Sequence, residues 1–147
     1  MVKHIAVFLV LVVSLSMSAI AQELPEYSNS SVFKLQIEGL KKAEGEIRIA
    51  MFNSKDSYTK DPIHAVVITV DSTLVEWEVD GLPFGEYAIA VYHDKNENGK
   101  LDTNFLGIPK ESYGFSNNAR GRFGPASWDD AQFVVTKEEE IHLIKIK

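Results

Sequence analysis

The sequence contains no cysteine, and this absence excludes several kinds of chemistry at once. Without cysteine there is no disulfide framework, no thiolate metal site, no cysteine nucleophile and no N-terminal cysteine to carry a lipid. The fold must therefore be held by burial of apolar side chains, unless a metal ion helps. A chain of 147 residues is long enough for one domain of this kind.

Basic residues and histidines are also in short supply. The chain has 15 Lys and Arg against 21 Asp and Glu, and a formal net charge of −6. Because phosphate backbones are bound by clustered Lys and Arg, nucleic acid is not an expected partner. The histidines beyond the N-terminal segment are His64, His93 and His142, and they lack the spacing of zinc ligands.

Long apolar runs are confined to the N-terminal segment, residues 1–21, which reads MVKHIAVFLVLVVSLSMSAIA. A short basic start precedes an apolar run over residues 5–13, and small residues at Ala19 and Ala21 suit cleavage, an order typical of a secretory signal peptide. The run is too short for a membrane span, which needs about 20 residues. We therefore expect an exported protein, periplasmic or extracellular, that starts at Gln22 and has no membrane span after cleavage.

The remainder divides into a polar segment and one domain. Residues 22–31 contain Pro25 and a Ser/Asn cluster, which predict a flexible leader before a single domain over residues 32–147. In that domain, apolar and polar residues alternate, which predicts half-buried strands because neighbouring side chains point to opposite faces. The seven predicted strands cover residues 32–38, 46–51, 65–70, 75–79, 87–92, 133–135 and 141–146.

The number of strands and their alternation favour an all-β fold, a seven-stranded antiparallel β-sandwich of the immunoglobulin or prealbumin type, with a closed barrel as the alternative. The segment over residues 87–92 is apolar on both faces, which predicts a central strand. In the last strand the alternation slips at Leu143 and Ile144, which predicts a bulge or a change of face. The residues expected in the core are Ile49, Val66, Trp77, Tyr87, Ile89, Val91 and Phe133.

One long segment, between His93 and Asp130, has no strand pattern. A structureless loop of this length in a compact domain is usually functional or disordered, and its aromatic content argues against disorder. We expect an ordered excursion packed by its own aromatic side chains. Arg120 and Arg122 could bind a carboxylate or phosphate, but in so acidic a chain ion pairs with residues 129–130 or the other loop acids are the expectation.

The start of this loop has the spacing of a calcium site. Asp94, Asn96 and Asn98 fall at positions 1, 3 and 5 of an oxygen-ligand loop, with Gly99 at the sharp turn of position 6. Phe105 stands at position 12, where a bidentate Glu is expected. The alternative is a hairpin tip whose Asp and Asn side chains bond to their own backbone. The predicted Ca²⁺ ligands are Asp94, Asn96, Asn98, the carbonyl of Lys100, Asp102 and, from further along, Glu111.

Two stretches of the sequence together resemble a known family. The turn in GLPFGEYAIAVYHD is similar to one in prealbumin-like and carboxypeptidase-regulatory-like sandwiches. The segment YHDKNENGKLDTNFLGIPKESYGFSNNARGRFGPASWDDAQF resembles the secreted bacterial family known as domain of unknown function 2141 (DUF2141), over about residues 32–147. Ser112 departs from the glycine expected there. The resemblance implies an exported β-sandwich and lends no catalytic residues, because the family has no assigned activity.

Two functions remain open at this point. The first is an exported, non-enzymatic binding or structural module with a calcium-organised loop at residues 94–111, whose partner is a protein, a glycan or an envelope component. The second is a hydrolase that uses the carboxylates of Asp94, Asp102 and Glu111. Oxygens that converge on one point at about 2.4 Å would favour the metal site. Two carboxylates that face each other across an open cleft would favour the enzyme. The sequence does not decide the oligomeric state.

Overall fold

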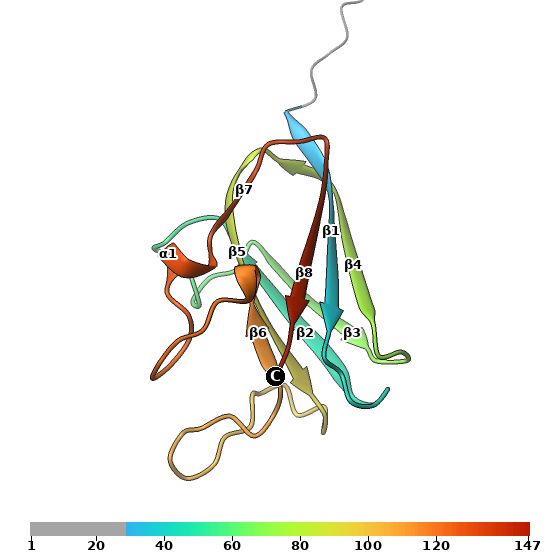
Figure 1. Ribbon diagram of the computed structural model, residues 1–147, viewed down its shortest axis with the longest axis vertical. Coiled ribbons are helices and arrows are strands. Elements are labelled where there is room, and N and C mark those ends of the chain that lie inside the picture. Colours follow the sequence, from blue (N-terminus) through green and yellow to red (C-terminus); the bar gives the residue numbers. More distant parts are fainter. Residues whose placement is uncertain (1–28) are drawn as a thin grey trace, which may run out of the picture.

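A computed structural model of the chain describes residues 29–147, which form two β-sheets packed face to face (Figure 1). The predicted signal peptide lies outside the described residues, as does most of the predicted leader. The strands are β1 (Ser30–Glu38), β2 (Glu46–Phe52), β3 (His64–Thr69), β4 (Val75–Pro83), β5 (Gly85–Asp94), β6 (Tyr113–Phe115), β7 (Phe133–Val135) and β8 (Glu139–Lys145), with a 3₁₀ turn η1 (Ser116–Asn118) and a short helix α1 (Trp128–Ala131). Among residues 29–147, no helix is long and apolar enough to cross a membrane.

The smaller sheet has the order β4-β1-β8, and the larger has the order β3-β2-β5-β6, with β7 also paired to β5. The strands pair antiparallel except β1 and β8, which run parallel. The predicted all-β sandwich is therefore confirmed, while two details differ. One pair is parallel, which the long connection from the first strand to the last permits. The described residues also contain an eighth strand, β6, inside the segment predicted to have none.

The core lies between the sheets and follows from the alternation. Phe33, Leu35 and Ile37 of β1 are fully buried and contact alternate residues of the opposite sheet. Of the residues expected in the core, Val66 and Trp77 are only partly buried against it, because they lie on β3 and β4 at sheet edges. The others are buried as predicted, namely Ile49, Tyr87, Ile89, Val91 and Phe133.

Strand β5 is buried on both faces, as its sequence predicts. Ile89 and Val91 enter the core between the sheets, whereas Ala88 belongs to a second apolar cluster on the outer face. That cluster is built with Phe115 and Trp128, both from the long segment after β5. Some aromatic residues of this segment are therefore buried against β5, close to η1 and α1. Their burial fixes the ends of the exposed loops.

The last strand contains no bulge, contrary to the prediction at Leu143 and Ile144. Its register with β1 is unbroken from the Val32–Glu139 pair to the Glu38–Lys145 pair. Ile141 and Leu143 simply lie on the solvent face, while Ile144 is fully buried. The apparent slip in the pattern arises because the outer face of β8 also carries apolar residues.

The predicted turn before β5 is present and is closed by a side chain. The hydroxyl of Tyr87 donates to the carbonyl of Pro83 at 2.7 Å. The chain passes there from β4 in one sheet to β5 in the other. This hydrogen bond fixes the beginning of β5 to the turn between the two sheets. The other end of β5 is Asp94, and the long loop begins there.

Candidate functional site

The loop between β5 and β6 begins with a buried carboxylate. Asp94 is fully buried, and its Oδ1 accepts from the backbone amide of Asn98 at 3.1 Å. Its Oδ2 accepts from the amide of Gly99 at 2.7 Å and from Nε of Arg48 at 2.8 Å. Burial by itself would raise the pKa of Asp94, but the hydrogen bonds from Gly99, Arg48 and Asn98 outweigh it and hold this pKa below its ordinary value. Asp94 is therefore a charged anchor for the turn that follows.

Arg48, on β2, supplies the positive partner of this anchor. Besides its bond to Asp94, it donates from Nη2 to Glu46 at 2.8 Å. The hydrogen bond to Asp94 is the main reason that the pKa of Arg48 is raised. Gly45, just before β2, has a φ of +71°, and a Cβ there would lie only 2.7 Å from the Cα of Lys95. The start of β2 therefore fits closely against the start of the loop.

The turn itself is stabilised by asparagine side chains. Oδ1 of Asn96 accepts from the amide of Asn98 at 3.3 Å, and Oδ1 of Asn98 accepts from the amide of Lys100 at 2.9 Å. Gly99 has a φ of +80°, the left-handed conformation expected at the sharp turn of such a loop. These contacts are those of the polar turn that the sequence left open as the alternative to a calcium loop.

A second buried carboxylate, Glu111, closes the loop from its far end. Its Oε1 accepts from the amide of Lys95 at 2.8 Å, and its Oε2 accepts from the amide of Asp102 at 2.9 Å. The amide of His93 also donates to the carbonyl of Ser112 at 2.8 Å. Glu111, near the end of the loop, thus holds two points near its start, Lys95 and Asp102. Its position in the sequence alone does not reveal this role.

Asp102 completes the network from the surface. Its Oδ2 accepts from the side-chain amide of Asn96 at 2.8 Å, and its Oδ1 accepts from that of Asn98 at 3.1 Å. The structure therefore brings together five of the predicted ligand side chains, namely Asp94, Asn96, Asn98, Asp102 and Glu111. Lys100 joins the network through its amide N–H, rather than through the carbonyl that the calcium prediction assigned to it. We refer to these residues, with Arg48, as the carboxylate clasp.

The clasp meets the requirements of a calcium site only in part. Within residues 29–147, no three His, Cys, Asp or Glu side chains are grouped so that they could hold a metal ion. Ca²⁺ takes six to eight oxygen ligands, so Asn96, Asn98 and a backbone carbonyl would have to supply several of them. A cation would also have to displace the two asparagine amides that donate to Asp102.

The hydrolase alternative gains nothing from this geometry. The carboxylates of Asp94 and Glu111 are buried, and their oxygens accept hydrogen bonds from backbone amides. Both oxygens of Asp102 accept from side-chain amides. The hydrogen bonds that these carboxylates accept hold the chain of the loop in place.

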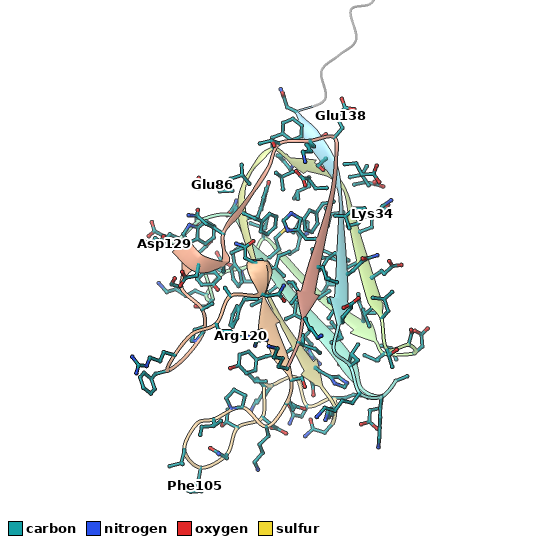
Figure 2. The ribbon with its side chains drawn as sticks, in the orientation of Figure 1. Lys34, Glu86, Phe105, Arg120, Asp129 and Glu138 are labelled. Carbon is teal, nitrogen blue, oxygen red and sulfur yellow. The ribbon has the colours of Figure 1, made fainter. Side chains whose placement is uncertain are left out.

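Beyond the clasp, the loop turns its apolar side chains outward. Asn104 satisfies the backbone of the turn, because its Oδ1 accepts from the amides of Leu106 at 2.9 Å and Ile108 at 3.0 Å. The exposed fraction is 94% for Phe105, 67% for Leu106 and 56% for Ile108. The expectation of an excursion packed by its own aromatic side chains therefore fails for Phe105, although Phe115 and Trp128 are buried. Figure 2 shows Phe105 at the far end of the loop, away from both sheets.

A second loop, over residues 119–127, repeats this feature. Arg120 donates to the carbonyls of Tyr113 at 3.1 Å and Lys145 at 3.2 Å, and its guanidinium lies over the ring of Tyr113. Arg122 lies 5.5 Å from the ring centroid of Phe123, whose exposed fraction is 95%. Because Arg120 reaches the first residue after the β5–β6 loop, the bases of the two loops adjoin.

The expected ion pairs of Arg120 and Arg122 are absent among residues 29–147. Asp129 pairs with Lys55 at 2.9 Å, and Asp130 accepts from the hydroxyl of Ser127 at 2.6 Å. The acids that were expected to neutralise the two arginines are therefore bonded to other groups. The arginines instead use backbone carbonyls and aromatic rings, which leaves their charge uncompensated.

His93 and His142 both make contacts within the fold. His93 is buried, and its Nε2 lies 2.6 Å from the carbonyl oxygen of Glu44. His142 packs against Phe33 and Phe133, and burial lowers its pKa. Each side chain therefore connects its own strand to another segment of the fold.

A hollow at the start of β1 is a weak candidate for a binding site. Its cation, Lys34, lies 3.6 Å from Glu78 and 3.4 Å from Glu139, so its charge is already paired. The hollow is lined by Ser30, Ser31, Val32, Lys34, Gly81, Glu138 and Glu139.

Comparison with known proteins identifies a family. A model of the family described as "Uncharacterized protein conserved in bacteria (DUF2141)" matches residues 35–142. This range includes the carboxylate clasp and both exposed loops, and it confirms the resemblance noted in the sequence. Comparisons with curated proteins and with solved structures found no match.

Proposed function

The chain belongs to the DUF2141 family of bacterial proteins, and we propose that this member is an exported, non-enzymatic binding domain whose β5–β6 loop contacts the partner. The observation that carries the proposal is that the β5–β6 loop is held at its base by many hydrogen bonds but exposes apolar side chains at its tip. Buried carboxylates hold the base of the loop, while Phe105, Leu106 and Ile108 remain largely exposed.

The free energy would fall if a partner covered the exposed apolar side chains at this tip. Apolar side chains that cluster on a surface are favourable to cover and often mark interaction sites. A preorganised loop also loses less conformational entropy when it binds than a flexible one does. The carboxylate clasp supplies that preorganisation, since it bonds both ends of the loop to each other and to β2. This arrangement suits recognition better than catalysis.

Export is part of the proposal and is supported by residues 1–21, which have the order of a signal peptide. Mass spectrometry of material recovered outside the cytoplasm should find Gln22 as the first residue. An intact N-terminal methionine in that material would contradict export by this route.

Calcium is a further part of the proposal. The spacing from Asp94 to Asp102 and the turn at Gly99 are those of an oxygen-ligand loop. Asn96, Asn98 and Asp102 already meet at one place, although through hydrogen bonds. Calcium would replace these hydrogen bonds by coordination and would stiffen the same loop that presents the apolar tip.

Site-specific photocrosslinking tests the binding function. A photoreactive phenylalanine analogue at position 105, in cells that express the chain, should give a defined adduct. The matched control is the same analogue at position 141, an exposed apolar site on β8. It is the strand partner of Lys34, and Figure 2 shows Lys34 far from Phe105. Adducts at position 105 alone support the proposal, whereas equal yields or none at either position contradict it.

A further inference from the structure

The apolar residues at the tips of the two exposed loops are considered together, and we call them the loop-tip surface: Phe105, Leu106, Ile108 and Phe123. Figure 1 shows both loops on the same side of the molecule, outside the two sheets. The contact of Arg120 with the carbonyl of Tyr113 joins their bases. Each loop ends in a phenylalanine that is more than nine-tenths exposed, at 94% for Phe105 and 95% for Phe123.

The charge around this surface is opposite in sign to that of the chain. From residue 103 to residue 128, the basic residues are Lys110, Arg120 and Arg122, and the one acid is Glu111. Glu111 is buried, with both oxygens bonded to backbone amides, whereas the three basic side chains are exposed. The net formal charge of the whole chain is −6. Exposed cations therefore outnumber exposed acids over residues 103–128 of an otherwise acidic protein.

The nearest acids bond to other groups. Asp129 is paired with Lys55, and Asp102 accepts from the neutral side-chain amides of Asn96 and Asn98, which leaves its negative charge in place. Glu97 is exposed and lies between Lys95 and Lys100 in the sequence. The loop-tip surface therefore combines apolar tips with three exposed cations in the same two loops.

We propose that the loop-tip surface docks on an anionic lipid bilayer, with Phe105 and Phe123 inserted at the interface and the basic side chains against the headgroups. Phe and Leu side chains of membrane-surface proteins bury at the boundary between headgroups and acyl chains, and Lys and Arg are attracted to an anionic surface. The two rings stand clear of the protein, so a folded protein partner would need two separate matching pockets. A bilayer interface surrounds protruding side chains without any preformed pocket. The inference rests on the proposed binding function and names its partner.

Vesicle binding tests the inference directly. The purified chain is added to vesicles of phosphatidylcholine alone and to vesicles that also contain phosphatidylglycerol. Binding to the anionic vesicles should be the stronger, and it should weaken as salt is added, because salt screens the headgroup charge. The double variant Phe105→Ser/Phe123→Ser should bind them at least about tenfold more weakly, since it loses the burial of two aromatic rings. All variants are purified as the processed chain that starts at Gln22, so the apolar run over residues 5–13 makes no contribution to vesicle binding.

Two further variants separate insertion from simple charge attraction. Lys110→Gln/Arg122→Gln should lose the preference for anionic vesicles, whereas Ile141→Ser, the matched apolar control on β8, should bind as the wild type does. In Phe105→Trp, anionic vesicles should shift the tryptophan emission to the blue, and brominated lipids should quench it. Free inorganic phosphate should produce neither change.

The outcomes distinguish this inference from the broader function. Failure of the wild type to bind anionic vesicles, or equal binding by the Phe105→Ser/Phe123→Ser variant, overturns the lipid inference. If position 105 then crosslinks to a protein, the binding function stands and the lipid assignment is wrong. If position 105 gives no adduct above the control at position 141, both fail.

Discussion

The two sheets keep their shape by burying apolar side chains, whereas the β5–β6 loop keeps its shape by burying carboxylates. Phe33 of β1 is fully buried and stacks on Phe133 with ring centroids 5.6 Å apart. Asp94 is equally buried, but it contacts backbone amides and a guanidinium. Apolar burial is non-directional, while hydrogen bonds specify geometry. The difference explains how the loop can be ordered while its own apolar residues stay outside.

The largest expected effect comes from a break in the apolar core. Phe33→Ala should lower the free energy of unfolding by about 3–5 kcal/mol, because it leaves a cavity beside Phe133. Urea denaturation followed by circular dichroism measures this. Phe105→Ala serves as the matched control, and it should change the free energy by less than about 0.5 kcal/mol because its ring is exposed. Similar losses for the two variants would contradict the assignment of core and tip.

A smaller loss is expected when the buried anchor of the loop is removed. Asp94→Ala should lower the free energy of unfolding by about 2–3 kcal/mol, since it leaves two backbone amides and the partly buried guanidinium of Arg48 without their charged acceptor. Hydrogen exchange should accelerate at the amides of Asn98 and Gly99 while β1 and β2 stay protected. If exchange is unchanged at these two amides, Asp94 does not organise the turn.

Acid should weaken the clasp by the same route. The pKa of Asp94 is lowered in the folded protein, so its carboxylate contributes stability above the unfolded pKa of about 3.9. That contribution is lost as pH falls through the folded pKa, because the unfolded chain takes up the proton first. The unfolding free energy of the wild type should therefore fall more steeply below about pH 4 than that of Asp94→Asn. If the unfolding free energies of the two proteins change with pH in the same way, the folded protein does not favour the charged form of Asp94.

The smallest expected effect is that of calcium. A site with few carboxylates should have a Kd on the order of 10⁻⁴ to 10⁻³ M. A tenfold excess over Kd then stabilises the folded state by about 1.4 kcal/mol and raises the melting temperature. Asp94→Ala should abolish the rise, while Asp71→Ala, in a different turn, should keep it. Magnesium should do little, because it demands tight octahedral geometry.

A null result would be equally informative about the loop. If millimolar calcium changes neither the melting curve nor the amide spectra of residues 94–102, the carboxylate clasp is a polar turn. Its order would then depend on its hydrogen bonds without a cation, including those of Asp94, Glu111 and Arg48.

Much of the sandwich could be predicted from the sequence because strand periodicity is local. Alternate residues of a strand face opposite sides, so the burial of Phe33, Leu35 and Ile37 is visible in the order of residues. The turn closed by Tyr87 and the grouping of Asp94 with Asn98 are also short-range. The outward apolar face of β8 misled the prediction of a bulge, because Leu143 is apolar in an exposed position.

The sequence by itself determined the strands, the tight turns and the polar character of the loop, since each depends on residues a few positions apart. Only the tertiary structure decided which distant groups meet. Arg48 lies 46 positions from Asp94, and Glu111 reaches back 16 positions to Lys95. Strand β6 has only three residues, too few to show a period. Whether Phe105 packs inward or stands exposed depends on the space left by the rest of the fold, and no local pattern contains that information.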